Sequence, residues 1–453
     1  MTRKRLIVVG GDAAGMSAAS QMRRLDRDRE IVVFERGPHT SYAACGIPYF
    51  VAGLIEKPDA LIARTPETFR ERYAIDARTL QEVTAIDVRG RTVQIEDRRE
   101  GRAYAMDYDD LLIATGALPF VPDVPSIDAE GVFGVNTLES AIALRRFLEN
   151  RQPRKAVVVG GGYIGLEMAE ALNCHRGLSV ALVERAPQVM GTLDPDMAAL
   201  VGEAIRDVGI TLRLGETLSA VETDDQGRVR AVVTDRGTVE ADLVVLGLGV
   251  RPNTALAADA GLSLGVRGAI RVDDRMATPT EGIWTAGDCA ETFHLVSRQP
   301  FHVALGTVAN KMGRVAGINL AGGEARFPGV VGTAVSKICK YEVARTGLLE
   351  AEATKFGLDF TMATVKTRTR AGYYPGAGRI HVKLLAEKGT GRLLGGQIVG
   401  VEGAAKRIDV LAACLHGRMT VQNLVDMDLS YAPPFSPVWD PVQVAARALL
   451  KEV

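Results

Sequence analysis

Two segments of this sequence follow one plan, and that plan constrains the fold more than any other feature. RLIVVGGDAAGMSAASQMRR is followed by IVVFER, and KAVVVGGGYIGLEMAEALN is followed by SVALVER. Each segment predicts a strand, a glycine-rich turn, a helix and a second strand, which together begin a dinucleotide-binding unit. The apolar runs at 6–9 and 156–159 are typical of strands buried on both faces of a parallel sheet. We therefore predict an α/β fold with two Rossmann-like dinucleotide-binding domains.

The second glycine turn fits the dinucleotide pattern at every position. Gly160 permits the tight turn, Gly162 lets the backbone approach a pyrophosphate, and Gly165 lets the helix pack on the strand. The start of the helix then offers free N–H groups to the phosphates. Glu184 follows Gly165 by 19 residues, where a carboxylate can bind ribose hydroxyls and repel a 2′-phosphate. This favours NADH over NADPH, although Arg185 beside it would soften the preference.

The first glycine turn keeps the outer spacing but not the middle glycine. Gly10 and Gly15 are present, whereas Asp12 takes the middle position, and Glu35 lies 20 residues beyond Gly15. One such motif is weak evidence, but two in order, each with its acidic residue, are strong. Asp288 in TAGDCA is a candidate for binding a cofactor hydroxyl; the alternative is a turn aspartate that bonds to its own backbone.

The remainder of the chain adds a third region of different texture. A length of 453 residues corresponds to about three domains. From about residue 325 the sequence alternates as antiparallel strands do, and a helical segment, GAAKRIDVLAACLHGRM, follows. We expect a separate α+β domain at 325–453.

Composition excludes several classes of partner. The net charge of −1 and the absence of an 18-residue apolar run argue against a nucleic acid partner and against a membrane span. The five cysteines, at 45, 174, 289, 339 and 414, show neither CxxC nor metal-ligand spacing. We expect free thiols, no metal site and a cytoplasmic location.

Cys45 stands alone in SYAACGIPYF, with no second cysteine nearby. An unpaired cysteine is commonly a small buried hydrophobe. Here it precedes a predicted helix with Pro48 near its first turn, so we expect the helix dipole to lower the pKa of the Cys45 thiol.

Taken in order, IVVGGDAAG, IVVFER, SYAACGIPYF, LLIATG, VVVGGGYIGLEMAE, GVRPN and TAGDCAE resemble the flavin-dependent pyridine nucleotide–disulfide oxidoreductases. Within that superfamily the chain is most similar to the single-cysteine branch, especially the coenzyme A-disulfide reductases. The resemblance implies an FAD-binding domain in two parts, 1–115 and 252–324. It also implies an inserted NAD(P)-binding domain at 116–251 and a homodimer formed through 325–453.

The resemblance also implies roles for individual residues. The FAD ligands would be Gly10, Gly15, Glu35, Arg36, Thr115, Gly116, Gly287 and Asp288. The NADH (or NADPH) ligands would be Gly160, Gly162, Tyr163, Ile164, Gly165, Glu184 and Gly249. The residues contacting a CoA-type thiol or disulfide would be Gln21, Arg24, Ser41 and Trp439. The catalytic residues would be Cys45, Tyr431 of the partner subunit, and Tyr373 or Tyr374.

Two positions depart from the coenzyme A-disulfide reductase pattern. Ala44 and Trp439 stand where members of that group often have an asparagine and, in some cases, a lysine that contact CoA. An aromatic side chain can stack on the ligand but cannot pair with phosphate.

The implied activity is NAD(P)H-dependent reduction of a low-molecular-weight disulfide, with CoA disulfide preferred. Electrons pass through the flavin to Cys45, the substrate sulfur supplies the second half of a mixed disulfide, and Tyr431 protonates the departing thiolate. One alternative is an NADH oxidase or peroxidase that cycles through cysteine sulfenic acid. It is disfavoured because Ala13 occupies the place of the turn histidine that those enzymes carry. Polysulfide or CoA-persulfide reduction remains open, as does a non-enzymatic flavin redox sensor acting through dimer contacts.

Overall fold

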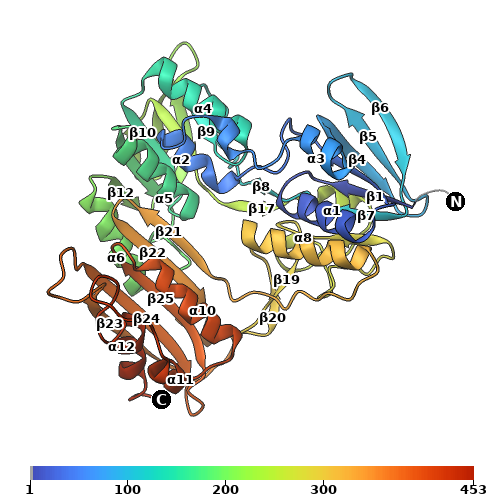
Figure 1. The fold of residues 1–453 in the computed structure, drawn as a ribbon. Helices are drawn as coiled ribbons and strands as arrows, with labels where there is room; N and C mark the ends of the chain where they lie inside the picture. The colour runs from blue at the N-terminus through green and yellow to red at the C-terminus, as the bar shows by residue number, and fades with distance from the viewer. Residues whose placement is uncertain (1–3) are drawn as a thin grey trace.

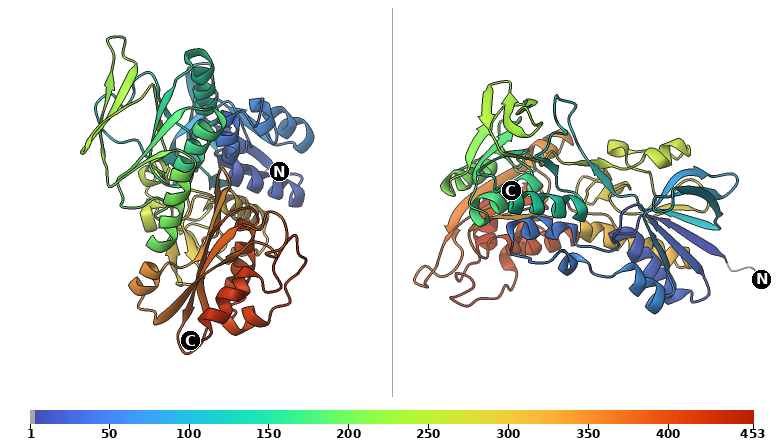
Figure 2. Two further views of the ribbon diagram at one scale, coloured as in Figure 1. Left: turned by 90° about the vertical axis from the view of Figure 1, so that its left-hand side faces the viewer. Right: turned by 90° about the horizontal axis from the view of Figure 1, so that it is seen from above.

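The protein folds into three units, each built around one sheet (Figures 1 and 2). The computed structural model describes residues 4–453. The first and second units contain parallel sheets, and the C-terminal unit contains an antiparallel one. The predicted α/β class with two Rossmann-like units and a C-terminal α+β unit is confirmed.

The first unit places its glycine turn at the centre of a five-stranded parallel sheet. Buried apolar residues of β1 lie between β2 and β7, as the double-sided apolar run predicted. Helices α1 (Ala13–Leu25) and α8 (Gly306–Leu320) pack closely on one face. The other face is covered by the antiparallel strands β4 (Gln81–Asp87), β5 (Thr92–Asp97) and β6 (Arg102–Asp107). In spatial order the sheet strands are β18 (Ile283–Thr285), β7 (Asp110–Ile113), β1 (Arg5–Val9), β2 (Glu30–Glu35) and β3 (Asp76–Thr79).

The second unit repeats this plan. Helices α4 (Leu138–Arg151), α5 (Tyr163–Glu170) and α6 (Pro195–Asp207) contribute to the core on one face of its sheet. The three-stranded sheet β13 (Leu218–Thr223), β14 (Val229–Thr234) and β15 (Gly237–Glu240) covers the other face. The main strands in spatial order are β12 (Thr211–Leu214), β11 (Ser179–Glu184), β10 (Lys155–Val159), β16 (Leu243–Leu246) and β9 (Val132–Gly134).

Two connecting segments join these two units, and they form a short two-stranded sheet with each other. Strand β8 (Ala117–Pro119) leaves the first unit and β17 (Val250–Pro252) returns to it, as an antiparallel pair. A two-stranded connection of this kind joins units that otherwise have separate sheets.

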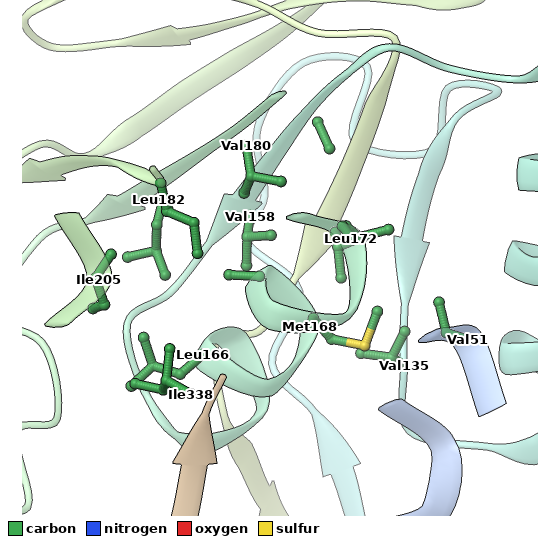
Figure 3. Close-up of a cluster of buried hydrophobic side chains, with 14 of the residues drawn as sticks. Val51, Val135, Val158, Leu166, Met168, Leu172, Val180, Leu182, Ile205 and Ile338 are labelled. Atoms are coloured by element: carbon green, nitrogen blue, oxygen red, sulfur yellow. The ribbon is translucent and has the colours of Figure 1, made fainter. Parts of the chain in front are cut away.

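A short helix of the first segment of the chain packs on the second unit. Helix α2 (Ile47–Ala52) contributes Ile47, Phe50 and Val51 to the core formed by α4 and α5. Figure 3 shows Val51 beside Val135 and Met168 in this cluster. The helix that follows Cys45 therefore belongs to the second unit in space.

The C-terminal unit is a five-stranded antiparallel sheet with helices on one face. Helices α10 (Ile408–His416), α11 (Val421–Asp426) and α12 (Pro441–Leu449) form its core together with β24 and β25. Ile338, Val343 and Val399 join the core of the second unit instead. In spatial order the strands are β21 (Ala334–Ile338), β22 (Tyr341–Gly347), β25 (Leu393–Gly400), β24 (Arg379–Glu387) and β23 (Phe360–Arg368).

A buried lysine fixes the C-terminal unit to the second one. Lys383 is 1% exposed, and its Nζ lies 3.2 Å from Asp194 Oδ2 and 2.6 Å from Asp196 Oδ1. It also pairs with Glu350. Gln397 completes the cluster through its Nε2 donor, 2.6 Å from Asp194 Oδ2. The ammonium group therefore pairs with three carboxylates at this junction.

The expectation of five free cysteines is wrong for two of them. Cys174 and Cys339 form a disulfide although 165 residues separate them. Cys174 lies in η3, a π-helical turn (Ala171–His175) that continues α5, and Cys339 lies in the turn between β21 and β22. Spacing along the chain does not reveal this pair, because packing of the C-terminal unit on the second unit brings it together. Cys289 and Cys414 are buried free thiols.

Within residues 4–453, no helix combines the length and the apolar character needed to cross a bilayer.

Candidate active site

The two glycine turns have nearly the same backbone geometry. Gly10 and Gly160 take φ values of +109° and +110°, a region that favours glycine. A Cβ added to Gly15 would lie 2.0 Å from the Gly10 carbonyl oxygen, and one added to Gly165 would lie 1.8 Å from that of Gly160. The outer glycines are therefore required by the close approach of helix and turn.

The turns differ at the middle position. A Cβ added to Gly162 would meet no atom within 4 Å, so the space above this turn is open. Asp12 precedes α1 and accepts a hydrogen bond at Oδ1 from the Tyr42 N–H, at 3.2 Å. Burial, together with the charge of Glu35, raises the pKa of Asp12 to about 7. The first turn is thus linked to the segment that leads to Cys45.

A glutamate lies at the end of the strand beside each turn, where the spacing placed it, and its carboxylate bonds to backbone N–H groups of the turn and of the residues that follow the strand. Glu35 accepts hydrogen bonds from the N–H groups of Gly11 (2.8 Å) and Gly37 (2.7 Å). Glu184 accepts the equivalent pair, from Gly161 (2.6 Å) and Ala186 (2.7 Å). Arg36, next to Glu35, is exposed.

The other predicted flavin ligands gather at the carboxyl edge of the first sheet, where its parallel strands end. Thr115 follows β7 and donates from Oγ1 to the Asn253 carbonyl at 2.6 Å. Gly116 has φ +69° and open space around an added Cβ. Asp288 follows β18 and Gly287 and accepts the Leu305 N–H, while burial raises the pKa of Asp288 to about 6.

Cys45 lies in the 3₁₀ turn η1 (Ala44–Gly46), directly before α2. It is exposed, yet the surrounding protein partly desolvates its thiol. This desolvation raises the pKa of Cys45, and the charges of Glu167 and Asp288 raise it further. The expected lowering of the thiol pKa is therefore wrong in direction. Helix α2 is only 6 residues long, and carboxylates of both units act against the thiolate.

No motif of the sequence assigned a role to Glu167, yet its charge is one of those that raise the pKa of Cys45. Glu167 lies on α5, accepts a hydrogen bond from Ser336 Oγ at 3.2 Å, and has a pKa raised to about 7 by burial. Helical spacing could have found it, because Tyr163 and Glu167 are four residues apart and share a face of α5. Tyr163 Oη accepts a hydrogen bond from Thr192 Oγ1 at 3.3 Å, and its neighbour Ile164 also lies in the first turn of the helix.

Two predicted substrate residues lie together on α1. Arg24 donates from Nη1 to Gln21 Oε1 at 3.3 Å.

Ser41 has φ +50° and donates its N–H to the Gly11 carbonyl at 2.9 Å, so the Cys45 loop is anchored on the first glycine turn. Gly249, a predicted nicotinamide-cofactor residue, follows β16 with φ +84°.

The predicted catalytic tyrosines lie on the C-terminal unit. Tyr431 hydrogen-bonds with Tyr373, which raises the pKa of Tyr431. Tyr374 lies next in the chain, 37% exposed. Trp439 is 43% exposed, and the Arg447 guanidinium carbon lies 4.3 Å from its ring centroid. Within residues 4–453, no hydrogen bond or ring contact joins these side chains to the Cys45 loop of the same chain.

The fold and the site define a redox protein with two dinucleotide sites and one exposed thiol. The chain belongs to the pyridine nucleotide-disulphide oxidoreductase family, whose model matches residues 4–313, and the model of the family's dimerisation domain matches residues 333–441. It is a flavoprotein oxidoreductase that uses FAD and NAD(P)H.

Similar proteins cover nearly the whole chain. The chain is 41% identical over 448 residues to the NAD(P)H coenzyme A polysulfide/persulfide reductase of Pyrococcus horikoshii, covering 99% of this chain and 98% of that one. It is 31% identical to a coenzyme A disulfide reductase of Staphylococcus haemolyticus, covering 96% of each. The solved structure of an NAD-dependent persulfide reductase from A. fulgidus matches with a TM-score of 0.95 and 40% identity, covering 99% of this chain and 83% of that one.

Proposed function

We propose that this protein uses NAD(P)H and FAD to reduce a low-molecular-weight disulfide of the coenzyme A type through Cys45. One observation carries the proposal: in residues 4–453, Cys45 is the one exposed free cysteine, and it adjoins the cofactor edge of the first sheet. A thiol without a protein partner must take its second sulfur from the substrate.

The two expected cofactor sites have room for their ligands. The open space at Gly116 and Gly162, and the buried Asp288 carboxylate with a backbone donor as its partner, leave room for phosphates and hydroxyls. Bound FAD would supply the two electrons taken from NAD(P)H. Glu184 would favour NADH, since its carboxylate repels a 2′-phosphate.

Cys45 would act as the nucleophile. Its thiolate attacks the substrate disulfide, the Cys45–substrate mixed disulfide forms, and one substrate thiolate leaves. Tyr431 of the partner subunit would protonate that thiolate, with the partner subunit's Tyr373 as its hydrogen-bond neighbour. This requires a homodimer, and the dimerisation domain supports one.

Gln21, Arg24 and Ser41 would contact the CoA portion of the substrate. Trp439 of the partner subunit would offer an aromatic surface to the ligand. A thiol that must return to its reduced form in every cycle suits a reducing cytoplasm.

The second candidate substrate is a CoA persulfide or a polysulfide. The identities favour it, because the relatives named for these compounds share more residues with the chain than the relatives named for CoA disulfide. Both substrates use the same sulfur exchange at Cys45.

The test is anaerobic oxidation of NADH and NADPH with CoA disulfide, polysulfide, CoA persulfide and peroxide supplied separately. We expect turnover with a sulfur substrate that is lost in Cys45→Ser and kept in Cys414→Ser, since Cys414 is buried in the C-terminal core. Turnover that survives in Cys45→Ser would refute the role of Cys45. Turnover with peroxide alone would assign the protein to the oxidase and peroxidase class.

A further inference from the structure

The thiol-bearing segment is held by both units: Ser41 and Tyr42 bond to the first glycine turn, and α2 packs on the second unit. Apolar residues of α2 lie in the core of the second unit, and Figure 3 shows Val51 of α2 next to Val135 and Met168. Only Gly46 separates Cys45 from the first residue of α2. Whatever fixes α2 on the second unit therefore also fixes the sulfur.

Two arginines of the second unit bond to the carbonyl end of α2. Arg145, on α4, donates from Nη1 to the Phe50 carbonyl at 3.2 Å and to the Ile55 carbonyl at 2.8 Å. Arg176, just beyond η3, donates from Nε to the Val51 carbonyl at 2.6 Å. The last carbonyls of a helix have no partner within the helix, and cations suit its negative end.

Packing supports the same geometry. The Arg145 guanidinium carbon lies 4.6 Å from the centroid of the Phe50 ring, and Arg145 Nε lies 3.0 Å from Glu149 Oε1. A Cβ added to Gly53, the residue that ends α2 with φ +87°, would lie 3.3 Å from the Arg176 guanidinium. Backbone and guanidinium are therefore in close contact.

This arrangement places two like charges near each other. Burial lowers the pKa of Arg176, and the charge of Arg145 lowers it further. Arg176 Nη2 is also buried without a hydrogen-bond partner among residues 4–453. The repulsion between the two guanidinium groups and the missing hydrogen bond of Arg176 both destabilise the folded protein. The contacts of the two arginines with α2 offset this cost.

We propose that Arg145 and Arg176 are positioning residues for Cys45, which hold the carbonyl end of α2 and thereby set where its sulfur lies. The inference rests on the proposed role of Cys45 in sulfur exchange. It also means that the position of the thiol depends on both units: its loop bonds to the flavin turn, and α2 is held by the unit that carries the nicotinamide-cofactor turn.

The test separates the two half-reactions in the FAD-containing enzyme. The variants are Arg145→Gln, Arg176→Gln, the double variant that combines them, Arg145→Lys and Arg176→Lys. Arg151→Gln is the matched control, because Arg151 also lies on α4 but pairs with the exposed Glu130. Stopped-flow absorbance follows reduction of the flavin by NADH and its reoxidation by the disulfide. The rate of iodoacetamide alkylation from pH 6 to 10 follows Cys45, the exposed free thiol.

We expect the double variant to lose about tenfold or more in the reoxidation rate, since a misplacement of about 1 Å can cost on the order of 100-fold. Flavin reduction and the KM for NADH should change by less than about twofold, and the alkylation profile should move. A lysine at position 145 or 176 should restore part of the rate, because its ammonium group keeps the positive charge and can donate to a carbonyl, although it lacks the planar fork of a guanidinium.

Two outcomes would overturn the inference. In the first, the folded double variant keeps both its reoxidation rate and its alkylation profile. In the second, the two half-reactions slow equally, which indicates a general loss of structure. Failure of the proposed function is distinguishable, since it would appear in the wild type as no reoxidation by any disulfide, whereas the alkylation profile still reports on α2.

Discussion

The first and second glycine turns have nearly the same backbone conformation but make different contacts. Both have an outer glycine near φ +110°, a second glycine pressed against its carbonyl, and a glutamate that bonds to the turn. At the middle position the second turn has the open Gly162, whereas the first has Asp12, bonded to the Tyr42 N–H. The backbone conformation is shared, and the difference at the middle position ties only the first turn to the cysteine loop.

The helices that follow the turns extend the difference. Ser17 and Glu167 occupy equivalent positions, two residues after the last glycine of each turn. Ser17 Oγ lies 2.7 Å from Asn310 Oδ1 on α8, so it joins two helices of the first unit. Glu167 acts electrostatically on Cys45, which comes from the first segment of the chain. The helix after the second turn thus affects the pKa of a thiol in the first segment of the chain, whereas the helix after the first turn bonds to another helix of its own unit.

The largest expected effect comes from the outer glycines. Gly15→Ala and Gly165→Ala each place a Cβ within 2.0 Å of a backbone carbonyl oxygen, and overpacking costs about 1–3 kcal/mol or more. Gly15→Ala should purify without bound flavin. Gly165→Ala should keep its flavin but fail to be reduced by NADH. The ratio of flavin to protein absorbance and stopped-flow reduction measure the two effects.

Gly191→Ala is the control for these variants, because an added Cβ there meets no atom within 4 Å. If Gly15→Ala keeps a full complement of flavin, the two turns do not divide the cofactors as inferred.

An intermediate effect is expected at Glu167. Glu167→Gln removes a carboxylate that is ionised above about pH 7 and that raises the pKa of Cys45. The thiol should then ionise at lower pH, and its alkylation at pH 8 should be roughly two- to fivefold faster, as a charge interaction of about 0.5–1 kcal/mol gives. Rates measured from pH 6 to 10 locate the change. Glu170→Gln, on the same helix, should leave the profile in place, and an unchanged profile in Glu167→Gln would contradict the assignment.

The smallest expected effect concerns Asp12. Its pKa in the folded protein, about 7, lies above its ordinary value of 3.8, so the native state binds the proton more tightly between these values. Stability therefore falls as pH rises through this window, and Asp12→Asn removes the loss while keeping an acceptor for the Tyr42 N–H. The difference in melting temperature between variant and wild type should be smaller at pH 5 than at pH 8, where the variant should melt about 2–4 °C higher.

Asp224→Asn provides the comparison for Asp12→Asn. The pKa of Asp224 is lowered to about 2 by its hydrogen bonds with Arg228, so its contribution does not change between pH 5 and 8. Melting curves of Asp12→Asn that run parallel to those of the wild type over this range would contradict the prediction.

Local pattern predicted much of the fold. The apolar runs of β1 and β10, the glycine turns, and the glutamates 20 and 19 residues beyond them are signals within short stretches of chain. The alternation after residue 325 likewise predicted the antiparallel sheet.

The remaining features depend on contacts between units. Arg145 reaches Phe50 across 95 residues, and Arg176 reaches Val51 across 125. The sequence-based prediction for the pKa of Cys45 considered only the start of α2. The charges of Glu167 and Asp288, which lie far from Cys45 in the sequence, raise that pKa instead. Periodicity and spacing carry no information about such partners, because the packing of whole units decides them.

The disulfide between Cys174 and Cys339, which lie 165 positions apart, closes the chain into a covalent ring that includes about half of the second unit and the later segment of the first. Such a ring restricts the unfolded chain, by about 5 kcal/mol in the loop-entropy model. A protease cut anywhere inside the ring would leave the two pieces joined until the bond is reduced. Cys174 is exposed, so thiols in the surroundings can reach it. The apparent size of nicked protein on a denaturing gel would then record the balance of thiols and disulfides to which the molecule had been exposed.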